Sequence, residues 1–353
     1  MARPVRVLIV DDSALVRNIL SQGLSMDPAI EVVGTAPDPY IARDQIVKLQ
    51  PDVITLDVEM PRMDGVAFLR KLMPQYPVPI IMVSSLTQRG KQITMEALEA
   101  GAVDFVAKPT SNVAAGLNAM LAELRSKVKI ASTANVSHWK GKKIVSNSQG
   151  TAARSSSALA ESTDKIIAIG ASTGGTEAIR RVIENFPATT AGTVIVQHMP
   201  SGFTKMFSDR LNQLCQMQVK EAEHGDRVRS GLILVAPGGK QLEVIRSGGF
   251  YEIRLGSSEK VSGHCPSVDV MMHSVAKHVG SNAVGAMLTG MGQDGAEGML
   301  AMKQAGAHCI SQDEASSVVF GMPKVAYEKG GAERLVPLDK IATTLLSLLT
   351  EKK

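Results

Sequence analysis

The chain has 353 residues, of which 44% are hydrophobic and 20% are charged, and its formal net charge is +4. This length predicts two domains with cores of their own. The mild charge without a dense Lys/Arg stripe argues against a nucleic-acid-binding surface, and no apolar run approaches the roughly 20 residues of a membrane-spanning helix. Three widely spaced cysteines and a start unlike a signal peptide favour the reducing cytoplasm over a disulfide framework or a zinc site.

Residues 1–130 alternate short apolar runs with segments of helical spacing. The predicted strands are Val5–Val10, Ile30–Val33, Val53–Leu56, Ile80–Val83 and Asp104–Ala107. Predicted helices lie between them, and Val113–Val128 closes the set. This alternation predicts a doubly wound parallel sheet of five strands with helices on both faces. Such sheets bind their ligands beyond the carboxyl ends of the strands.

Reactive side chains stand at those strand ends. They are Asp11 and Asp12 after the first strand, Asp57 after the third, Ser84 after the fourth and Lys108 after the fifth. Three carboxylates at one edge repel one another unless a hard cation such as Mg²⁺ bridges them. A hydroxyl and a lysine beside them can hold phosphoryl oxygens. Asp57 alone is compatible with a turn residue and Lys108 alone with a solvated loop charge, but their shared placement favours a phosphoryl site.

The motifs around these residues resemble the receiver domain of two-component response regulators, which has a flavodoxin-like fold. They read Val-Asp-Asp-Ser at 10–13, Asp-Val-Glu-Met-Pro-Arg-Met-Asp-Gly at 57–65 and Ala-Lys-Pro at 107–109. The resemblance implies that Asp57 accepts a phosphoryl group from a histidine kinase. It also implies an Mg²⁺ site made by Asp11, Asp12, Asp57 and the backbone carbonyl of Glu59.

The same resemblance implies a phosphorylation switch. Ser84 and Lys108 would contact the phosphoryl oxygens. Phe105, three residues before the lysine, stands where the family places an aromatic switch residue. The segment 85–90 lengthens the loop that follows Ser84, which is a departure from the family pattern.

Residues 131–163 lose this periodicity and are dominated by Ser, Thr, Ala and Asn. Such a composition buries too little apolar surface to order itself, so we predict a flexible, solvated linker. The only tryptophan, Trp139, lies here beside Lys140, Lys142 and Lys143. An alternative prediction is a docking segment in which Trp139 is an amphipathic anchor.

The stretch Lys165–Gly175 opens the predicted second domain, residues 164–353. An Ile-rich run predicts a buried parallel strand, and the glycines after it predict a tight turn into a helix over Glu177–Asn185. Gly170, Ser172 and Gly174 fit the Gly-x-Ser-x-Gly pattern of a nucleophile elbow. Two alternatives remain on this stretch alone, namely a serine that caps the helix and a phosphate-cradling loop.

Further strands and helices alternate through the second domain. Strand-like runs lie at Thr193–Gln197, Leu232–Ala236, Ala283–Leu288 and His308–Ser311. Helical patterns lie at Phe203–Leu214, Val268–Val279 and Leu338–Leu349, and a hairpin is predicted for Leu242–Ile245 and Tyr251–Leu255. We therefore predict a three-layer α/β domain whose sheet is mostly parallel, with the hairpin as the exception.

Ser172, His198 and Asp294 each follow a predicted strand. A serine hydroxyl needs a base to take its proton, and the base needs a carboxylate to fix its tautomer. Singly, His198 is compatible with a loop histidine and Asp294 with a helix N-cap; His264 is the strongest rival for the base. The order Ser, His, Asp differs from that of α/β hydrolases. A dinucleotide site is disfavoured because Gly-x-Gly-x-x-Gly is missing.

The motifs that hold these residues resemble the catalytic domain of the chemotaxis protein-glutamate methylesterases, the CheB family. They are Ile-Gly-Ala-Ser-Thr-Gly-Gly, Gln-His-Met-Pro, Met-Gly-Gln-Asp-Gly-Ala and Gln-Asp-Glu-Ala-Ser-Ser-Val-Val-Phe-Gly-Met-Pro. The resemblance implies that Ser172 is the nucleophile, His198 the general base and Asp294 its orienting acid. Thr173 and the Met291 N–H would stabilise the oxyanion, and no cofactor is implied for this step.

The family resemblance also implies the biological reaction. The substrates would be glutamate methyl esters on the cytoplasmic helices of chemoreceptors, which would be the only link to a membrane, and particular receptor glutamines would be deamidated. The unphosphorylated receiver would inhibit the esterase. Two other classes are a receiver-linked transcription regulator, which lacks a helix-turn-helix signal here, and a non-catalytic receptor-binding scaffold, which would have lost a triad residue.

Overall fold

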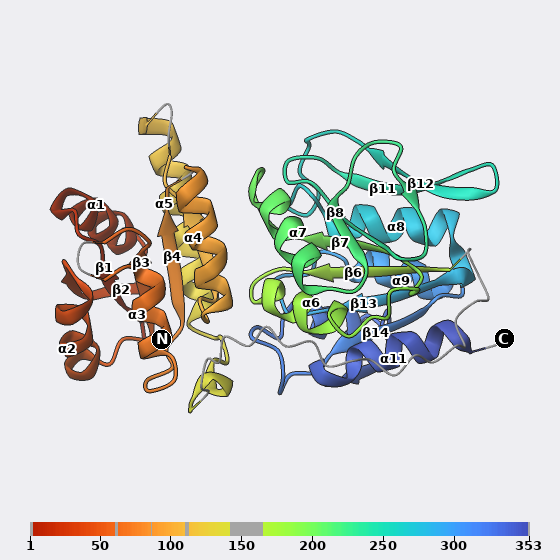
Figure 1. Ribbon diagram of the computed structural model, residues 1–353. Helices are drawn as coiled ribbons and strands as arrows, with labels where there is room; N and C mark the ends of the chain where they lie inside the picture. Colours follow the sequence, from red (N-terminus) through yellow and green to blue (C-terminus); the bar gives the residue numbers. More distant parts are fainter. Residues whose placement is uncertain (1–2, 61–62, 86, 110–112, 142–164, 352–353) are drawn as a thin grey trace. The chain divides into compact units, whose positions relative to one another are not determined.

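The computed structural model describes residues 3–60, 63–85, 87–109, 113–141 and 165–351 (Figure 1). The chain separates into two units, Met1–Ser148 and Gln149–Lys353. Most of the predicted linker, residues 142–163, lies outside the described residues. The domain limits at 130 and 163 therefore stay a prediction.

The first unit is built on the predicted five-stranded parallel sheet. Its strands are β1 (Val5–Val10), β2 (Ile30–Ala36), β3 (Val53–Asp57), β4 (Ile80–Ser84) and β5 (Asp104–Ala107). Their order is β2-β1-β3-β4-β5, and every neighbouring pair is parallel. All residues of β3 and β4 are buried. Helices cover both faces of these strands, which explains why the strands read as unbroken apolar runs.

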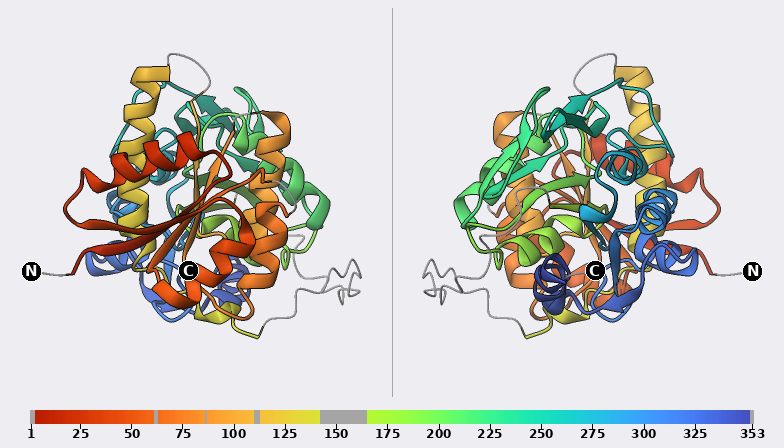
Figure 2. Two further views of the ribbon diagram at one scale, coloured as in Figure 1. Left: turned by 90° about the vertical axis from the view of Figure 1, so that its left-hand side faces the viewer. Right: turned by 90° about the vertical axis from the view of Figure 1, so that its right-hand side faces the viewer.

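Five helices cover this sheet. They are α1 (Ala14–Ser25), α2 (Pro39–Leu49), α3 (Gly65–Leu72), α4 (Gln88–Glu99) and α5 (Val113–Ala131). Helix α1 contacts α5 on one face and α3 contacts α4 on the other (Figure 2). The first four helices begin at residues whose side-chain oxygens accept hydrogen bonds from backbone N–H groups of the first turn, namely Ser13, Asp38, Asp64 and Thr87. Each helix start is therefore specified locally.

Trp139 lies buried on the first unit, in a short 3₁₀ helix, η1 (Ser137–Trp139), that follows α5. Only 6% of Trp139 is exposed. Its ring covers Gly101, where a Cβ atom would lie 3.0 Å from the indole, and Gly141 N donates to Pro74 O. The prediction of a solvated tether is wrong at Trp139, because burial of the indole outweighs the polar composition around it. The alternative prediction, an anchoring tryptophan, fits this position.

The second unit contains a seven-stranded sheet in which every neighbouring pair is parallel. In spatial order its strands are β15 (Arg334–Val336), β14 (His308–Gln312), β13 (Ala283–Met287), β6 (Ile166–Ala171), β7 (Gly192–Gln197), β10 (Leu232–Val235) and β8 (Gln218–Glu221). Strand β6 is buried at every residue and has β13 and β7 as neighbours. The predicted α/β architecture is confirmed.

The predicted hairpin forms, but it belongs to a different sheet. Strands β11 (Leu242–Ser247) and β12 (Phe250–Leu255) pair antiparallel, and β9 (Arg227–Val228) joins them in a sheet of three. The expectation that the hairpin makes the main sheet less than purely parallel is wrong, because the hairpin lies outside the seven-stranded sheet. The hairpin packs instead on helix α8 (Val268–His278), where the Ser274 hydroxyl accepts a hydrogen bond from Val244 N.

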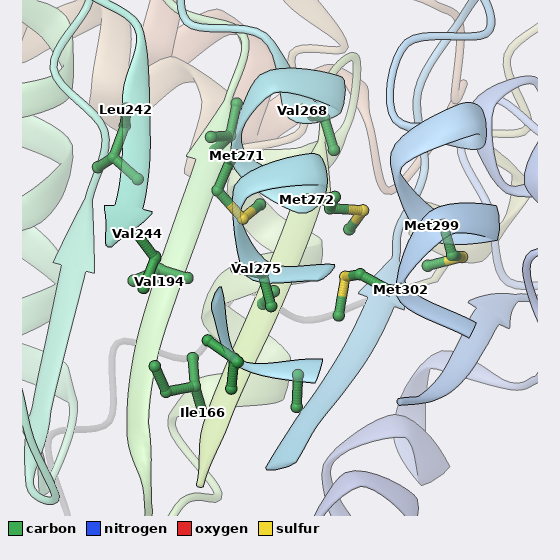
Figure 3. Close-up of a cluster of buried hydrophobic side chains, with 14 of the residues drawn as sticks. Ile166, Val194, Leu242, Val244, Val268, Met271, Met272, Val275, Met299 and Met302 are labelled. Atoms are coloured by element: carbon green, nitrogen blue, oxygen red, sulfur yellow. The ribbon is translucent and has the colours of Figure 1, made fainter. Parts of the chain in front are cut away.

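Helix α8 is the central helix of this unit. It contacts β11, the strands β6, β7 and β13, and helix α9 (Ala296–Gln304). Methionines of both helices fill the space above the sheet, as Figure 3 shows for Met272, Met299 and Met302. The flexible methionine side chain suits such an irregular space. These contacts hold α8 on the sheet, so that the start of the helix lies at the carboxyl end of β6.

The remaining helices of the second unit complete its layers. They are α6 (Gly175–Ile183), α7 (Phe203–Leu214), α10 (Met322–Glu328) and α11 (Leu338–Thr350), with a 3₁₀ turn, η2, at Gly280–Asn282. Helices α6 and α11 contact each other, and α11 contacts β13 and β14 (Figure 1). None of the helices in the described residues combines the length and the apolar character needed to cross a bilayer.

The burial of Trp139 makes its fluorescence a probe of the first unit. We expect a blue-shifted emission that acrylamide quenches weakly, because 6% of the residue is exposed. Trp139→Ala should lower the free energy of unfolding of this unit by about 3–5 kcal/mol, as truncation of large core residues does. Calorimetry measures this change, and Tyr40→Ala, at a half-exposed position of α2, is the control. Emission typical of a solvated indole would contradict the assignment.

Candidate active site

Ser172 lies in the turn between β6 and α6, where three contacts fix its backbone. Its N–H donates to Thr289 O (3.0 Å), and its carbonyl accepts from Gly175 N (2.7 Å) and from the side chain of Gln197 (Nε2–O 2.9 Å). Gln197 ends β7, and Thr289 follows β13. The neighbouring strands on both sides therefore hold this turn, as a nucleophile elbow requires.

The start of α8 approaches this edge of the sheet closely. A Cβ atom at Gly170 would lie 2.3 Å from Val268 Cγ1, and one at Gly295 would lie 2.4 Å from the same atom. Only glycine leaves room for Val268 at these two positions. The first glycine of the Gly-x-Ser-x-Gly pattern thus admits a helix start next to the serine.

His198 and Asp294 meet at the same edge. His198 follows β7, and its backbone N–H donates to the carbonyl of Ala171 (3.1 Å), which is the residue before Ser172. Asp294 follows β13, in the turn that leads into α9. The distance from His198 Nε2 to Asp294 Oδ2 is 2.7 Å, and both side chains are buried. The structure therefore brings together the three strand ends on which the predicted triad residues stand.

The Asp294 carboxylate is surrounded by donors. The Ser267 hydroxyl donates to Oδ1 (2.7 Å), Val268 N donates to Oδ2 (2.7 Å) and Asp269 N donates to Oδ1 (3.2 Å). Burial acts to raise the pKa of Asp294, but the hydrogen bonds and charge of His198, with those from Ser267 and Val268, outweigh it and lower the pKa. His198 thus contributes most to keeping the carboxylate ionised, and the donors at the start of α8 add to it, as a helix N-terminus favours an anion.

The bond to Asp294 determines the tautomer of His198. A carboxylate only accepts hydrogen bonds, so Nε2 carries the proton and Nδ1 carries a lone pair. Within the described residues, His198 Nδ1 is buried and has no hydrogen-bond partner. An imidazole held in this way is ready to accept a proton at Nδ1 from a hydroxyl beside it.

The other described histidines do not make this contact with Asp294. The His264 ring stacks on that of His198, with centroids 3.6 Å apart and planes 8° apart. His273 bonds to Asp269 O within α8, and His308 bonds to Glu333. The predicted rival, His264, therefore faces the base without occupying its place.

Thr173 and Met291, the predicted oxyanion residues, flank Ser172. Thr173 is buried, and its carbonyl accepts from the Thr289 hydroxyl (3.0 Å). Met291 lies two residues after Thr289, whose carbonyl accepts from Ser172 N, and Met291 is about half exposed. Both residues therefore lie in segments that are hydrogen-bonded to each other or to the Ser172 turn.

Sequence reasoning missed the polar residues that support this site. Ser267, Gln197 and Thr289 are buried, and each bonds to Asp294 or to the Ser172 turn. Ser267 has a local signal, since it precedes a helical pattern and caps α8. Its bond to a carboxylate 27 residues away has no such signal.

The first unit carries a separate polar site at the carboxyl edge of its own sheet. Oxygen atoms of Asp11, Asp12 and Asp57 lie within 4.8 Å of one another, and Asp11 and Asp57 are buried. Lys108 Nζ lies 3.0 Å from Asp11 Oδ2 and 3.0 Å from Asp57 Oδ1. Three converging carboxylates form the oxygen donor set that suits a hard cation such as Mg²⁺.

Burial dominates the ionisation of Asp57. It raises the pKa of Asp57 to about 6, with a further contribution from the Asp11 charge, against the opposing effects of Lys108 and of the bond from Val58 N. Burial tends to lower the pKa of Lys108, but Asp57 and Asp11 outweigh it and raise the pKa. The single positive charge of the lysine thus offsets only part of the negative charge of the carboxylate cluster.

Ser84 and Phe105, the predicted switch residues, point into the first unit. The Ser84 hydroxyl accepts from Thr94 Oγ1 (2.6 Å) and donates to Gly90 O (3.1 Å), both on α4. Phe105 is buried, and Lys127 Nζ lies 5.3 Å from its ring centroid. The Ser84 hydroxyl therefore bonds to α4 in this structure, whereas the prediction directs it to phosphoryl oxygens.

Comparison with known proteins gives the same division of the chain. The family model described as CheB methylesterase matches residues 167–345, and the response regulator receiver domain model matches residues 7–119. A protein-glutamate methylesterase/protein-glutamine glutaminase of Syntrophotalea carbinolica is 68% identical over 353 residues, which is 100% of both chains. The Salmonella typhimurium protein of that name is 51% identical and covers 98% of this chain and 97% of its own.

The second unit is similar to a solved structure. The crystal structure of the Thermotoga maritima CheB methylesterase catalytic domain is 38% identical in sequence, with a TM-score of 0.52. The match covers 53% of this chain and 100% of that chain. The matched range of the CheB methylesterase family model, residues 167–345, includes Ser172, His198 and Asp294.

Removal of the Ser267 hydroxyl tests how Asp294 is held. Ser267→Ala takes away a hydrogen bond to a buried carboxylate and the cap of α8. We expect the free energy of unfolding of the second unit to fall by about 2 kcal/mol. Calorimetry measures this, with Ser258→Ala at an exposed position as the control. Equal stability of both variants would show that the contact contributes little.

Proposed function

Because the chain belongs to the CheB methylesterase family, we propose that Ser172, His198 and Asp294 form the catalytic triad of this protein-glutamate methylesterase. The chain is a hydrolase with a receiver domain ahead of its catalytic unit, and it also acts as a protein-glutamine glutaminase. The family membership overturns the alternative of a transcription regulator. We further propose that its substrates are the methylated cytoplasmic helices of chemoreceptors and that the enzyme works in the cytoplasm.

One observation carries the triad assignment. His198 Nε2 is 2.7 Å from Asp294 Oδ2, while His198 Nδ1 is buried with no hydrogen-bond partner among the described residues. A buried nitrogen acceptor without a hydrogen bond lowers the stability of the fold, and a catalytic role is one reason why such a group is retained. The adjacent Ser172 turn supplies a hydroxyl as its natural partner during the reaction.

The chemistry of ester cleavage follows from this arrangement. Ser172 Oγ attacks the carbonyl carbon of the glutamate methyl ester as His198 Nδ1 takes the hydroxyl proton. The Asp294 carboxylate stabilises the imidazolium that forms. The backbone N–H groups of Thr173 and Met291 stabilise the oxyanion. The C–O bond to the methoxy group then breaks, and His198 returns the proton to release methanol.

Water completes the cycle by the same route. His198 removes a proton from a water molecule, the hydroxide attacks the acyl carbon, and the bond to Ser172 Oγ breaks as the proton returns to the serine. The product is a free glutamate carboxylate. A glutamine side chain gives the same acyl-enzyme with ammonia as the leaving group, so one site serves both activities.

The receiver site supports phosphorylation at Asp57. Asp11, Asp12 and Asp57 would hold Mg²⁺, whose charge offsets the repulsion among the carboxylates and the incoming phosphoryl group. Lys108, which already contacts Asp57, is in place to bind a phosphoryl oxygen. The phosphodonor proposed is a chemotaxis histidine kinase. We propose that the unphosphorylated receiver restrains the esterase and that phosphorylation shifts the equilibrium toward an active state.

Single substitutions test the triad. Ser172→Ala and His198→Ala should reduce methanol release from methylated receptor membranes by at least about 10³-fold, and Asp294→Ala should reduce it less. Near-parental activity of Ser172→Ala would refute the proposed mechanism. Loss of activity in Ser172→Ala also excludes a scaffold whose effect on receptors is non-catalytic.

Substitution of Asp57 tests the control of the esterase. A small phosphodonor with Mg²⁺ should label the full-length protein and accelerate methanol release. Asp57→Asn should abolish both effects, and removal of Mg²⁺ with a chelator should abolish labelling of the parent. Asp44→Asn, at an exposed position in the same unit, is the control. Labelling of Asp57→Asn at the parental level would overturn the assignment of the phosphorylated residue.

A further inference from the structure

We propose that His264 is a positioning residue that fixes the plane of the His198 ring by stacking on its face. This inference rests on the proposed function, because the base is His198 of that triad. The two rings lie with centroids 3.6 Å apart and planes only 8° apart. This is a face-to-face contact along the whole imidazole, and the catalytic steps described above do not use it.

The bond to Asp294 leaves one motion of His198 unrestrained. It holds the ring at Nε2, a single point on its edge. The torsion between Cβ and the ring of a histidine has broad minima, so rotation about this bond is easy unless neighbours prevent it. The lone pair of Nδ1 lies in the ring plane, and rotation would turn it away from the serine hydroxyl. A flat ring stacked on one face blocks this rotation.

The backbone of His264 is itself firmly held. Val261 and His264 exchange two hydrogen bonds, from Val261 N to His264 O (3.0 Å) and from His264 N to Val261 O (2.9 Å). The two residues between them have positive φ, +53° for Ser262 and +84° for Gly263. A positive φ at a serine is an uncommon conformation, and such conformations are found where a loop positions a functional group.

Gln241 connects this turn to the rest of the site. Its side chain is buried, and Nε2 donates to His264 O (3.1 Å). Its Oε1 accepts from Ser267 N (2.8 Å), and Ser267 bonds to Asp294. The side chain of Gln241 thus holds both His264, which stacks on the face of the His198 ring, and Ser267, which orients the carboxylate bonded to the edge of that ring. The segment 261–267 therefore contains two residues that position the proposed base, His198.

Replacing His264 with a flat aromatic residue that has no nitrogen distinguishes a stacking role from a role in proton transfer. His264→Phe keeps a face for His198 but has no nitrogen, whereas His264→Ala removes the face. His264→Leu fills a similar volume without a flat surface, and it serves if the alanine variant is poorly folded. Thermal unfolding of each full-length variant establishes that the second unit is intact.

The kinetic experiment measures methanol release from methylated receptor membranes at varied receptor concentration. We expect kcat to fall about tenfold in His264→Ala and His264→Leu with KM nearly unchanged, because misorientation of the base affects the reaction step rather than binding. His264→Phe should recover kcat to within about threefold of the parent. His308→Ala, at the opposite end of the sheet, is the matched control.

A second readout follows Ser172 directly. The rate at which a fluorophosphonate labels Ser172 should fall in His264→Ala and recover in His264→Phe, since labelling needs the same proton transfer to His198. A parental kcat in His264→Ala, with Ser172→Ala inactive, would overturn the inference and leave the proposed function intact. Equal loss in His264→Phe and His264→Ala would also overturn it, because it would assign His264 a proton-transfer role. Activity in Ser172→Ala would instead remove the proposed function itself.

Discussion

The carboxyl edge of the seven-stranded sheet, where the proposed triad lies, depends on the buried carboxylate of Asp294. An unpaired charge at this depth would destabilise the fold, so two surrounding elements supply hydrogen-bond donors. His198 comes from the end of β7, and Ser267 and Val268 come from the start of α8. Each donor compensates part of the burial cost and in return is fixed in place. The geometry of the proposed base therefore follows from the requirement to satisfy one anion.

The two units each bury a carboxylate, but the surroundings shift its pKa in opposite directions. Asp294 accepts enough hydrogen bonds to lower its pKa, so it remains an anion throughout the proposed reaction. Asp57 lies beside another carboxylate with one lysine between them, and its pKa is raised to about 6. The first arrangement gives a permanent orienting charge. The second leaves a centre that a divalent cation and a phosphoryl group can complete.

Much of this architecture could be predicted from the sequence because its signals are local. Apolar runs such as Val5–Val10 and Ile166–Ala171 are bounded by turn residues, and both form strands, of which β6 is buried throughout and β1 over its last four residues. The capping residues before the first helices are adjacent in sequence to what they cap. Because functional groups in α/β sheets follow the carboxyl ends of parallel strands, the sequence also predicted that Ser172, His198 and Asp294 lie at one edge.

The tertiary structure decided everything that depends on contacts between distant segments. The bond from Ser267 to Asp294, the link from Gln241 to His264 and the stack of His264 on His198 join residues that no periodic pattern relates. The positions of Trp139 and of the hairpin also depended on which apolar surface each of them could pack against. Periodicity reports how a residue faces its own strand or helix. It carries no information about which other segment meets that face, because packing and burial of the whole unit determine the partner.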